Sequence, residues 1–221
     1  MGVILDDQFT GSGNITGRAA GIGGTPTQYG AFSGGTCSIS SNGHASTGSS
    51  ATAGFYYSSA TPSSADYSVE MKVSMNAAQV ASGELVGPMG RCVSVTASFY
   101  IAGFFIDQPY LMRYSAGSVA DYIGTVAYPV NDGDVIWLKL KMTGSTIEMF
   151  IRTDAGSYPG TAQISATNTG LSAAGVPGLY FSSAADLNRV IATDSTVVAT
   201  RPGAASVVNA GPVMTFGGRT G

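Results

Sequence analysis

The stretch from Asn131 to Arg152, NDGDVIWLKLKMTGSTIEMFIR, determines how the rest of the sequence is interpreted. On both sides of Gly144-Ser145, apolar residues alternate with other residues, which is the pattern of a β-hairpin. A two-residue turn with glycine first sets the register of this hairpin. It predicts three apolar pairs on the inner face: Met142 with Ile147, Leu140 with Met149, and Leu138 with Ile151.

The same register pairs the residues on the outer face of the hairpin. Lys141 lies opposite Glu148 as a charge pair, and Lys139 lies opposite Phe150. Trp137 lies opposite Arg152, which predicts a cation–π contact. A slip of one residue would exchange the two faces, so the pattern fixes both together.

Composition favours one large β domain. The chain has 221 residues, of which 31 are glycine and 10% are charged, whereas ordinary soluble domains are about 25% charged. Its net charge is −3, and the ten basic residues are scattered along the sequence. We therefore expect no nucleic-acid partner, since such proteins carry clustered basic residues.

The sequence carries no recognisable targeting signal. The N-terminal MGVILDDQF lacks the basic segment of a secretory signal, and no apolar run approaches the roughly 18 residues of a membrane span. These features predict a protein made in the cytosol, with no membrane partner. We expect Cys37 and Cys92 to be buried free thiols, with a disulfide between them as the alternative.

Alternating patterns predict further strands along the chain. Residues 1–54 read as glycine-rich loops with short strands at 3–5, 28–32 and 37–39. Tyr67 to Met75 predicts a strand that is covered on one side. Further strands are expected at 88–97, 99–106, 110–114, 122–128, 175–182 and 189–198, while Ser183 to Asp186 is a weak start signal for a helix of two turns at most. This spacing is typical of a β-sandwich or jelly roll.

Several of these segments resemble a known family. The ordered set consists of Asp6 to Phe9 with Gly11 to Gly13 and Gly17-Arg18, Tyr67 to Met75, Gly87 to Arg91, and Asp132 to Ile151. It is similar to the concanavalin A-like lectin/glucanase jelly rolls found in bacteriophage structural proteins, over roughly residues 5 to 182. The resemblance implies an all-β jelly-roll or β-sandwich fold. From the strand pattern we expect this domain over 1–200, with extended terminal arms, the C-terminal one being 201–221.

Glycan-cleaving enzymes of this superfamily carry two glutamates flanking an aspartate at alternate positions of one strand. The three glutamates of this chain, Glu70, Glu84 and Glu148, have no second carboxylate two residues away. His44, the only histidine, lies in a turn-like segment, where a surface loop residue is expected rather than a catalytic base. We therefore expect no enzymatic activity and no catalytic residue.

The sequence also offers little to a metal or cofactor. Asp132 and Asp134 carry oxygen ligands suited to calcium, but NDG before a strand is typical of a tight turn, so we expect no metal there. One histidine and two distant cysteines cannot form a zinc site, and GIGG lacks the Lys-Ser/Thr and the helix of a phosphate loop. No cofactor is expected.

Aromatic faces are the remaining chemical feature of the sequence. Trp137, Phe150 and Arg152 share the outer face of the hairpin and are the candidate surface for a glycan or a partner. Tyr110, Tyr114, Tyr122 and Tyr128 offer further rings for stacking on sugars. The alternative is that all these aromatics pack sheets and loops.

Together these features favour a virion protein. A jelly roll without a signal peptide or reactive side chains suits a bacteriophage capsid decoration (cement) protein or a tail or fibre component, assembled in the host cytoplasm. Other coat or tail subunits, copies of the same chain and a host surface glycan are the expected partners. The alternatives are a free carbohydrate-binding, lectin-like module and a degraded glycoside hydrolase.

The C-terminal segment is expected to be an assembly arm. Pro202 and Gly203 separate it from the preceding strand, and its apolar residues are too few for a core of their own. We predict that it docks on a neighbouring subunit or adds a strand to its own sheet. The residues expected to dock are Val207, Val208, Val213, Met214 and Phe216.

Overall fold

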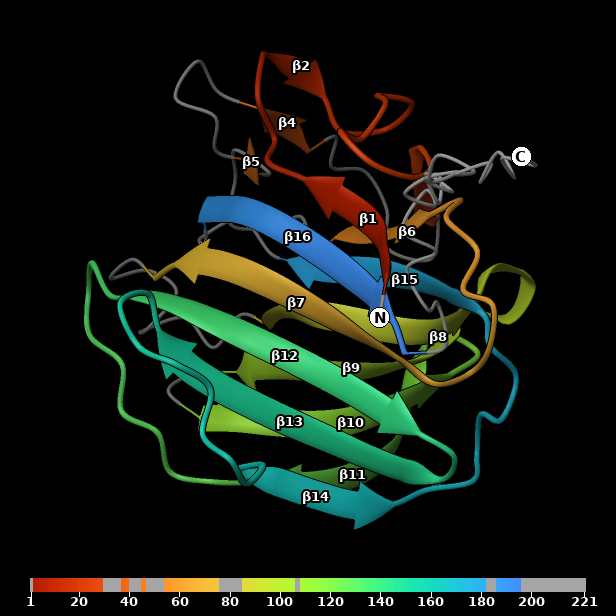
Figure 1. Ribbon diagram of the computed structural model, residues 1–221, viewed down its shortest axis with the longest axis vertical. Coiled ribbons are helices and arrows are strands. Elements are labelled where there is room, and N and C mark those ends of the chain that lie inside the picture. Colours follow the sequence, from red (N-terminus) through yellow and green to blue (C-terminus); the bar gives the residue numbers. More distant parts are fainter. Residues whose placement is uncertain are drawn as a thin grey trace, which may run out of the picture.

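The protein folds into two antiparallel β-sheets packed face to face (Figure 1). The structure is a computed structural model and describes residues 2–29, 37–39, 45–46, 54–75, 85–105, 108–181 and 186–195. Neighbouring strands along each sheet are often far apart in the sequence, as in a jelly roll. The expected all-β sandwich is thus confirmed over the described residues.

The first sheet, sheet A, follows the order β14-β13-β12-β7-β16-β5-β4-β2, and β1 also pairs with β16. Its strands are β1 (Gly2–Asp7), β2 (Gly13–Asn14), β4 (Ser38–Ile39), β5 (Ala45–Ser46), β7 (Tyr67–Ser74), β12 (Val135–Thr143), β13 (Thr146–Thr153), β14 (Ile164–Thr167) and β16 (Asp186–Asp194).

The second sheet, sheet B, follows the order β11-β10-β9-β8-β15-β6-β3. Its strands are β3 (Pro26–Tyr29), β6 (Gly54–Ser58), β8 (Val86–Val93), β9 (Ser98–Phe105), β10 (Gln108–Ser115), β11 (Ser118–Thr125) and β15 (Val176–Phe181). A single 3-10 turn, η1 (Ser94–Thr96), joins β8 to β9 within the described chain.

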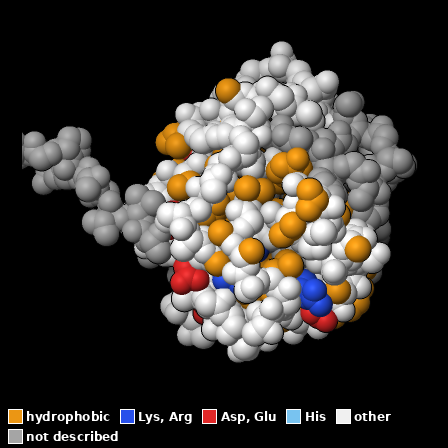
Figure 2. Space-filling view, turned by 90° about the vertical axis from the view of Figure 1, so that its right-hand side faces the viewer, with side chains coloured by type: hydrophobic (Ala, Val, Ile, Leu, Met, Phe, Trp, Pro, Cys, Tyr) orange, Lys and Arg blue, Asp and Glu red, His pale blue; other side chains and the backbone are white. Residues whose placement is uncertain are grey.

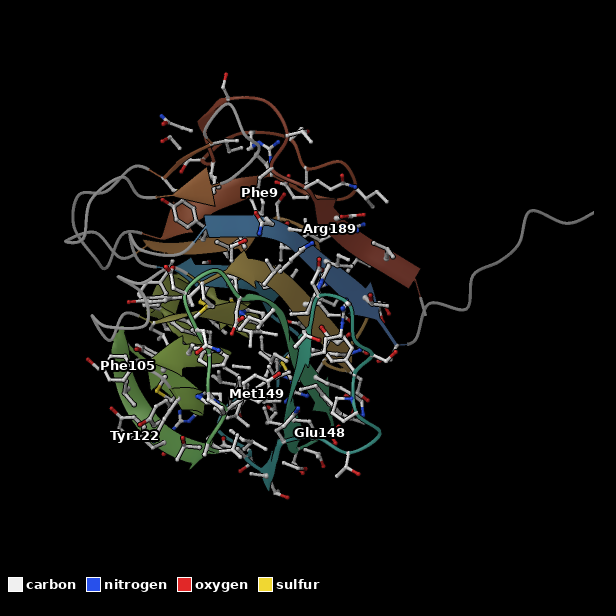
Figure 3. All side chains as sticks on the ribbon, turned by 90° about the vertical axis from the view of Figure 1, so that its left-hand side faces the viewer. Phe9, Phe105, Tyr122, Glu148, Met149 and Arg189 are labelled. Carbon is white, nitrogen blue, oxygen red and sulfur yellow. The ribbon has the colours of Figure 1, made fainter. Side chains whose placement is uncertain are left out.

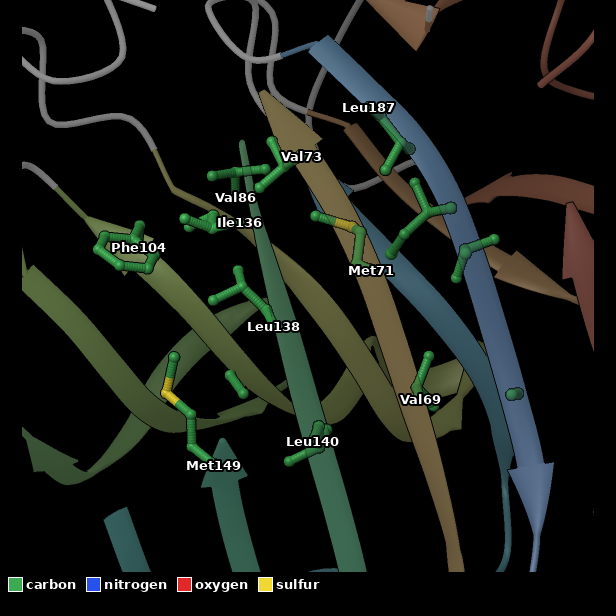
Figure 4. Close-up of a cluster of buried hydrophobic side chains, with 14 of the residues drawn as sticks. Val69, Met71, Val73, Val86, Phe104, Ile136, Leu138, Leu140, Met149 and Leu187 are labelled. Carbon is green, nitrogen blue, oxygen red and sulfur yellow. The ribbon is translucent and has the colours of Figure 1, made fainter. Parts of the chain in front are cut away.

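The predicted hairpin is present in the predicted register. Leu140 pairs with Met149 and Trp137 with Arg152, and Gly144 takes the positive φ of +54° that a glycine-first turn requires. The inward residues of the hairpin pack with those of β7 in the main core, which lies between the sheets (Figure 4). Lys141 and Glu148 form an ion pair of 2.7 Å on the outer face.

Several strand ends differ from those expected. Strand β8 ends at Val93 because the chain turns into η1, and β11 begins at Ser118, four residues before the expected start. The helix signal at Ser183 to Asp186 was wrong from Asp186 onward, because Asp186 to Asp194 pair with β7 as strand β16. Tertiary pairing outweighs a weak local capping signal here. Short β14 was not predicted at all.

A buried arginine joins the loops at one end of the sandwich. Arg91 in β8 is 1% exposed and adopts a φ of +50°. Its Nε and Nη2 atoms donate to the carbonyl oxygen of Ala65 at 3.1 and 3.0 Å. Its Nη1 donates to the carbonyl oxygen of Leu171 at 2.8 Å, and Nη2 also donates to that of Gly144 at 2.7 Å. The hairpin turn and two other loops are therefore held by one guanidinium group.

Sheet B carries a second apolar cluster on its outer face. The rings of Phe55 and Tyr180 lie 4.5 Å apart, and Phe99 stacks on Tyr114 at 4.8 Å. The other buried members of the cluster are Leu85, Met89, Cys92, Ile101 and Met112. Viewed over the strand ends, the surface shows charged side chains mainly near one rim, consistent with the low charge content (Figure 2).

Both cysteines are buried free thiols, as expected. Burial raises the pKa of Cys37 and of Cys92, so neither ionises readily.

None of the described segments forms a helix with the length and apolarity needed to span a membrane. The proposed C-terminal arm, including Val207, Val208, Val213, Met214 and Phe216, lies outside the described residues, as does His44.

The two faces of the hairpin should differ in what they contribute to stability. Leu140 is 0% exposed, so Leu140→Ala should lower the free energy of unfolding by about 2 to 5 kcal/mol through lost transfer energy and a cavity. Lys141→Ala removes a half-exposed ion pair and should cost under about 1 kcal/mol. Urea unfolding of both variants measures these costs, and equal costs would mean that the faces are assigned the wrong way round.

Candidate functional site

The outer face of sheet A carries three rows of side chains across β16, β7, β12 and β13. Cross-strand pairing defines each row, since opposite residues share a face. The first row is Thr193, Ser68, Lys141 and Glu148; the second is Ile191, Glu70, Lys139 and Phe150; the third is Arg189, Lys72, Trp137 and Arg152. This face therefore combines cations, carboxylates and aromatic rings.

Each lysine on this face pairs with a carboxylate. Lys139 Nζ lies 3.0 Å from Glu70 Oε1, in the same row. Lys72 Nζ donates to Asp154 Oδ2 at 2.9 Å, where Asp154 follows the end of β13. With the Lys141–Glu148 pair, these contacts leave the face close to neutral while its ammonium groups are held at defined positions.

The loop after β13 folds back over these rows. Tyr158 of this loop packs edge-on against Phe150, with ring centroids 6.3 Å apart. The guanidinium of Arg152 and the ammonium of Lys139 lie 5.0 and 5.3 Å from the centre of the Tyr158 ring. Cation–π attraction thus holds the loop against the sheet.

Gln163 fastens the other end of this loop to the edge of β13. Its side-chain oxygen accepts from the Ile151 N–H at 2.9 Å, and its side-chain nitrogen donates to the Ile151 carbonyl at 2.8 Å. Strand β14 pairs only with residues 146–149 of β13. At Ile151, beyond that pairing, the Gln163 side-chain amide makes the two hydrogen bonds that a neighbouring strand would otherwise make. Both ends of the loop are therefore fixed.

Trp137 lies beneath its neighbours rather than open to solvent. The Arg152 guanidinium stacks 4.5 Å from the Trp137 ring centre, and the indole Nε1 donates to Asp154 Oδ1 at 2.9 Å. The Trp137 side chain is 7% exposed as a result. It faces outward, as the sequence predicts, but it supports the loop and leaves little ring surface for a sugar.

A pocket of about 300 Å³ opens beside the loop. Its floor comes from the first two rows, and its walls come from the loop and from the ends of β12 and β16. The described residues that line it are Tyr67, Ser68, Lys139, Lys141, Met142, Thr143, Phe150, Tyr158, Pro159, Thr193 and Ser195. Hydroxyl and ammonium groups therefore face the same cavity as a phenol ring and a proline, which is a mixture typical of small-molecule sites.

The ionisation of the surrounding groups follows from their contacts. Burial raises the pKa of Tyr158, and the carboxylate of Glu70 raises it further, so its phenol stays neutral. The hydrogen bond from Lys72, followed by that from Trp137, lowers the pKa of Asp154, so it stays ionised at neutral pH. The pocket wall is thus neutral, while the pair beneath the loop is charged.

Trp137, Phe150 and Arg152 are brought together on one face, as the hairpin register predicts. The tyrosines proposed for stacking on sugars do not lie on this face. Tyr110 and Tyr122 lie on sheet B, and Figure 3 shows Tyr122 and Phe105 on the side of the sandwich opposite Glu148. Tyr114 packs in the outer cluster of sheet B, and Tyr128 packs edge-on against Phe104 at 6.1 Å.

The contribution of the loop after β13 was not predicted from the sequence. Tyr158 and Pro159 are separated from the hairpin by a turn, and no periodic pattern links them to it. An aromatic-proline pair in a short loop next to an outward-facing Phe150 is the only signal that could have pointed to this wall. Thr193 and Ser195 were equally unmarked, because β16 reaches the site only through its pairing with β7.

Asp132 and Asp134 lie in the loop before β12. The Asp134 carboxylate accepts the backbone N–H of Asn131 at 2.7 Å and its side-chain amide at 3.3 Å, which is the tight turn expected. Within the described ranges, no group of three or more His, Cys, Asp or Glu side chains is placed to hold a metal ion.

No protein-family model matches the sequence, and no curated protein matches it significantly. Solved structures do match. A carbohydrate-binding module, CBM66, from Bacillus subtilis has a TM-score of 0.51 at 17% identity, covering 85% of this chain and 95% of its own. The VIP36 exoplasmic/lumenal domain, in a form with Ca²⁺ and Man3GlcNAc bound, has a TM-score of 0.57 at 8% identity, covering 77% of this chain and 85% of its own.

A β-glucanase from Bacillus licheniformis gives a TM-score of 0.52 at 14% identity, covering 85% of this chain and 100% of its own. The fold is the concanavalin A-like jelly roll. This confirms the expected fold of lectins and glucanases. The neighbours provide no support for the bacteriophage context, which remains a proposal.

Acid should release the loop from the sheet of this jelly roll. The pKa of Asp154 is lowered in the folded protein, so its contribution to stability is present above the unfolded pKa and is lost as the pH falls through the folded pKa. Trp137, the only tryptophan, should therefore show constant fluorescence at neutral pH and a red shift only below pH 3.8, the ordinary pKa of Asp154.

The control for this titration is Asp154→Asn, which cannot ionise. Its emission should already be shifted at neutral pH and should lack the acid step, while far-ultraviolet circular dichroism reports that both sheets persist. Identical acid profiles for the two proteins would show that Asp154 does not hold the loop.

Proposed function

We propose that this protein is a non-enzymatic carbohydrate-binding protein, and that the pocket on the outer face of sheet A holds the saccharide. The observation that carries this proposal is the lining of the pocket. Its hydroxyl groups, from Ser68, Thr143 and Thr193, and its ammonium groups suit hydrogen bonds to sugar oxygens. Tyr158 and Pro159 provide an apolar wall against which a pyranose ring packs.

The likeness in fold to a carbohydrate-binding module and to a domain that holds Man3GlcNAc supports this proposal. By itself that likeness is an analogy, since one fold serves many functions. The pocket supports the proposal with a specific candidate place for a ligand, on a floor of paired strands. A loop fixed at both ends provides the wall, so little ordering is required when a ligand binds.

The absence of catalysis is part of the proposal. Hydrolysis of a glycosidic bond requires two carboxyl groups facing the same bond. Among the described residues that line the pocket, none carries a carboxyl group. The nearby Glu70 and Glu148 each accept a lysine ion pair, so neither is placed as an uncommitted acid next to a bound sugar.

A second candidate is the virion structural role expected from the sequence, as a capsid decoration protein or a tail or fibre component. One observation favours a protein-docking function. Phe105, Tyr110 and Tyr122 form a ladder of rings across β9, β10 and β11, with centroids 6.1 and 6.3 Å apart. Phe105 is 42% and Tyr122 72% exposed, and the ladder continues from the apolar outer cluster of sheet B.

Saccharide binding should depend on the wall of the pocket. Tyr158→Ala should weaken binding of any saccharide found on a glycan array by about 2- to 10-fold in calorimetry, because it removes an aromatic contact. Tyr122→Ala, on the opposite face, is the matched control and should bind normally. Release of reducing ends from a β-glucan that Glu148→Gln abolishes would contradict the non-enzymatic assignment.

The virion role makes a separate prediction. An antibody against the protein should label purified phage particles from the source that encodes it, and a Phe105→Ser/Tyr122→Ser double variant should be lost from those particles while staying folded. Particles without label, from cells that contain the protein, would rule this role out. That result would leave saccharide binding unaffected.

A further inference from the structure

The described lining of the pocket contains positively charged donors and no negatively charged acceptor. Lys139 and Lys141 are the charged groups among the described residues that line it. An ammonium group only donates hydrogen bonds, whereas a neutral sugar hydroxyl both donates and accepts. The side-chain acceptors of the described lining are neutral hydroxyl oxygens, with no carboxylate among them, so the ligand that suits the two ammonium groups best carries an anionic acceptor.

The carboxylates that pair with these lysines do not line the pocket. Glu148 accepts from Lys141 at 2.7 Å, and Glu70 lies 3.0 Å from Lys139. Neither glutamate is among the residues that face the cavity. Since each ammonium group has three N–H donors, a single pairing leaves donors for a ligand and fixes the direction of the side chain.

The two lysines differ in exposure. The Lys141 side chain is 43% exposed, while that of Lys139 is 24% exposed and lies against the Tyr158 ring. Lys141 is thus the cation that a ligand from solvent meets first, and Lys139 lies closer to the loop. Lys139 and Lys141 are two residues apart on β12, so their ammonium groups face the same side of the sheet. An acidic group of a ligand can therefore contact both of them.

Building on the proposed saccharide-binding function, we propose that the pocket selects an acidic saccharide, a uronic-acid oligosaccharide whose carboxylate is bound by Lys141 and Lys139. The hydroxyl groups of Ser68 and Thr193 lie in the same row as Lys141 and contact the ring hydroxyls. The Tyr158 phenol, kept neutral by burial, covers the apolar side of the sugar ring.

The first test compares each acid with its neutral form. Calorimetry is run with trisaccharides of galacturonate, glucuronate and mannuronate, with their methyl esters, and with a sulfated trisaccharide. At least one uronate should bind, its methyl ester should bind at least about tenfold more weakly, and added salt should weaken the acid alone. Preference for the sulfated sugar over every uronate would overturn the assignment to carboxylate.

The outcomes separate this inference from the function on which it rests. Equal affinity for an acid and its methyl ester would refute acid selection while leaving saccharide binding intact. Binding restricted to neutral sugars on the array would do the same. A protein that binds no saccharide at all would refute both.

Variants of the ion pair provide the sharper test. Lys141→Gln removes the cation and leaves the charge of Glu148 unpaired behind the pocket lining, so affinity for the uronate should fall about tenfold. Glu148→Gln removes the competing anion and should raise the same affinity. Arg189→Gln, which removes a cation of the same face that pairs with Asp6 and lies outside the pocket lining, is the charge-matched control and should have no effect.

These opposite signs distinguish ligand contact from a structural role. If the Lys141–Glu148 pair only stabilised the sheet, both substitutions would weaken binding and lower the melting temperature together. Loss of affinity in Glu148→Gln would therefore overturn the proposal. Circular dichroism of each variant confirms that the measured protein is folded.

Discussion

The guanidinium of Arg91 is the interaction on which the site end of this sandwich depends. A charged group removed from water is costly unless it is hydrogen-bonded, and Arg91 donates four hydrogen bonds to three backbone carbonyl oxygens. One of them belongs to Gly144, in the turn between β12 and β13. The Asp66 carboxylate accepts a hydrogen bond from the Gly144 N–H at 2.7 Å, and its Oδ1 lies 3.8 Å from Arg91 Nη2. Both the backbone carbonyl and the backbone N–H of Gly144 are thus hydrogen-bonded, which fixes the turn.

This anchoring reaches the pocket through short connections. Tyr67 follows Asp66 directly, and its hydroxyl accepts a hydrogen bond from the Arg91 backbone N–H. Tyr67, Ser68 and Thr143 all border the pocket, so the rim closest to the turn is part of the buried polar network. The two lysines stand on a strand whose end cannot shift without breaking that network. The wall opposite, formed by the loop after β13, depends on Asp154 and Gln163 instead.

The sequence predicted those parts of the structure that depend on local periodicity. The alternation in β12 and β13 determines the pairing register, the inner and outer faces of the hairpin and the Lys141–Glu148 pair together. A shift of one residue in the register would expose the apolar residues of the inner face. The sequence predicted the Arg152 guanidinium over Trp137, but it could not predict that the indole is also bonded from the loop, because Asp154, which accepts the indole N–H, lies in a loop without a period. It placed the last strand at 189–198 rather than at 186–194, because the start of β16 is set by pairing with β7 and not by an alternation of its own residues. The candidate face was therefore predicted, while the pocket was not.

Gln163 has a consequence for how the protein behaves in crowded solution. Strand β13 continues past the last residue that β14 covers, and an uncovered strand edge offers N–H and carbonyl groups that another chain can pair with. The Gln163 amide occupies both groups of Ile151, and its backbone N–H donates to the Met149 carbonyl at 3.0 Å. A single side chain thus acts as a one-residue substitute strand. In a protein with so few charges to keep copies apart, this amide protects sheet A from growing by edge-to-edge aggregation at that position.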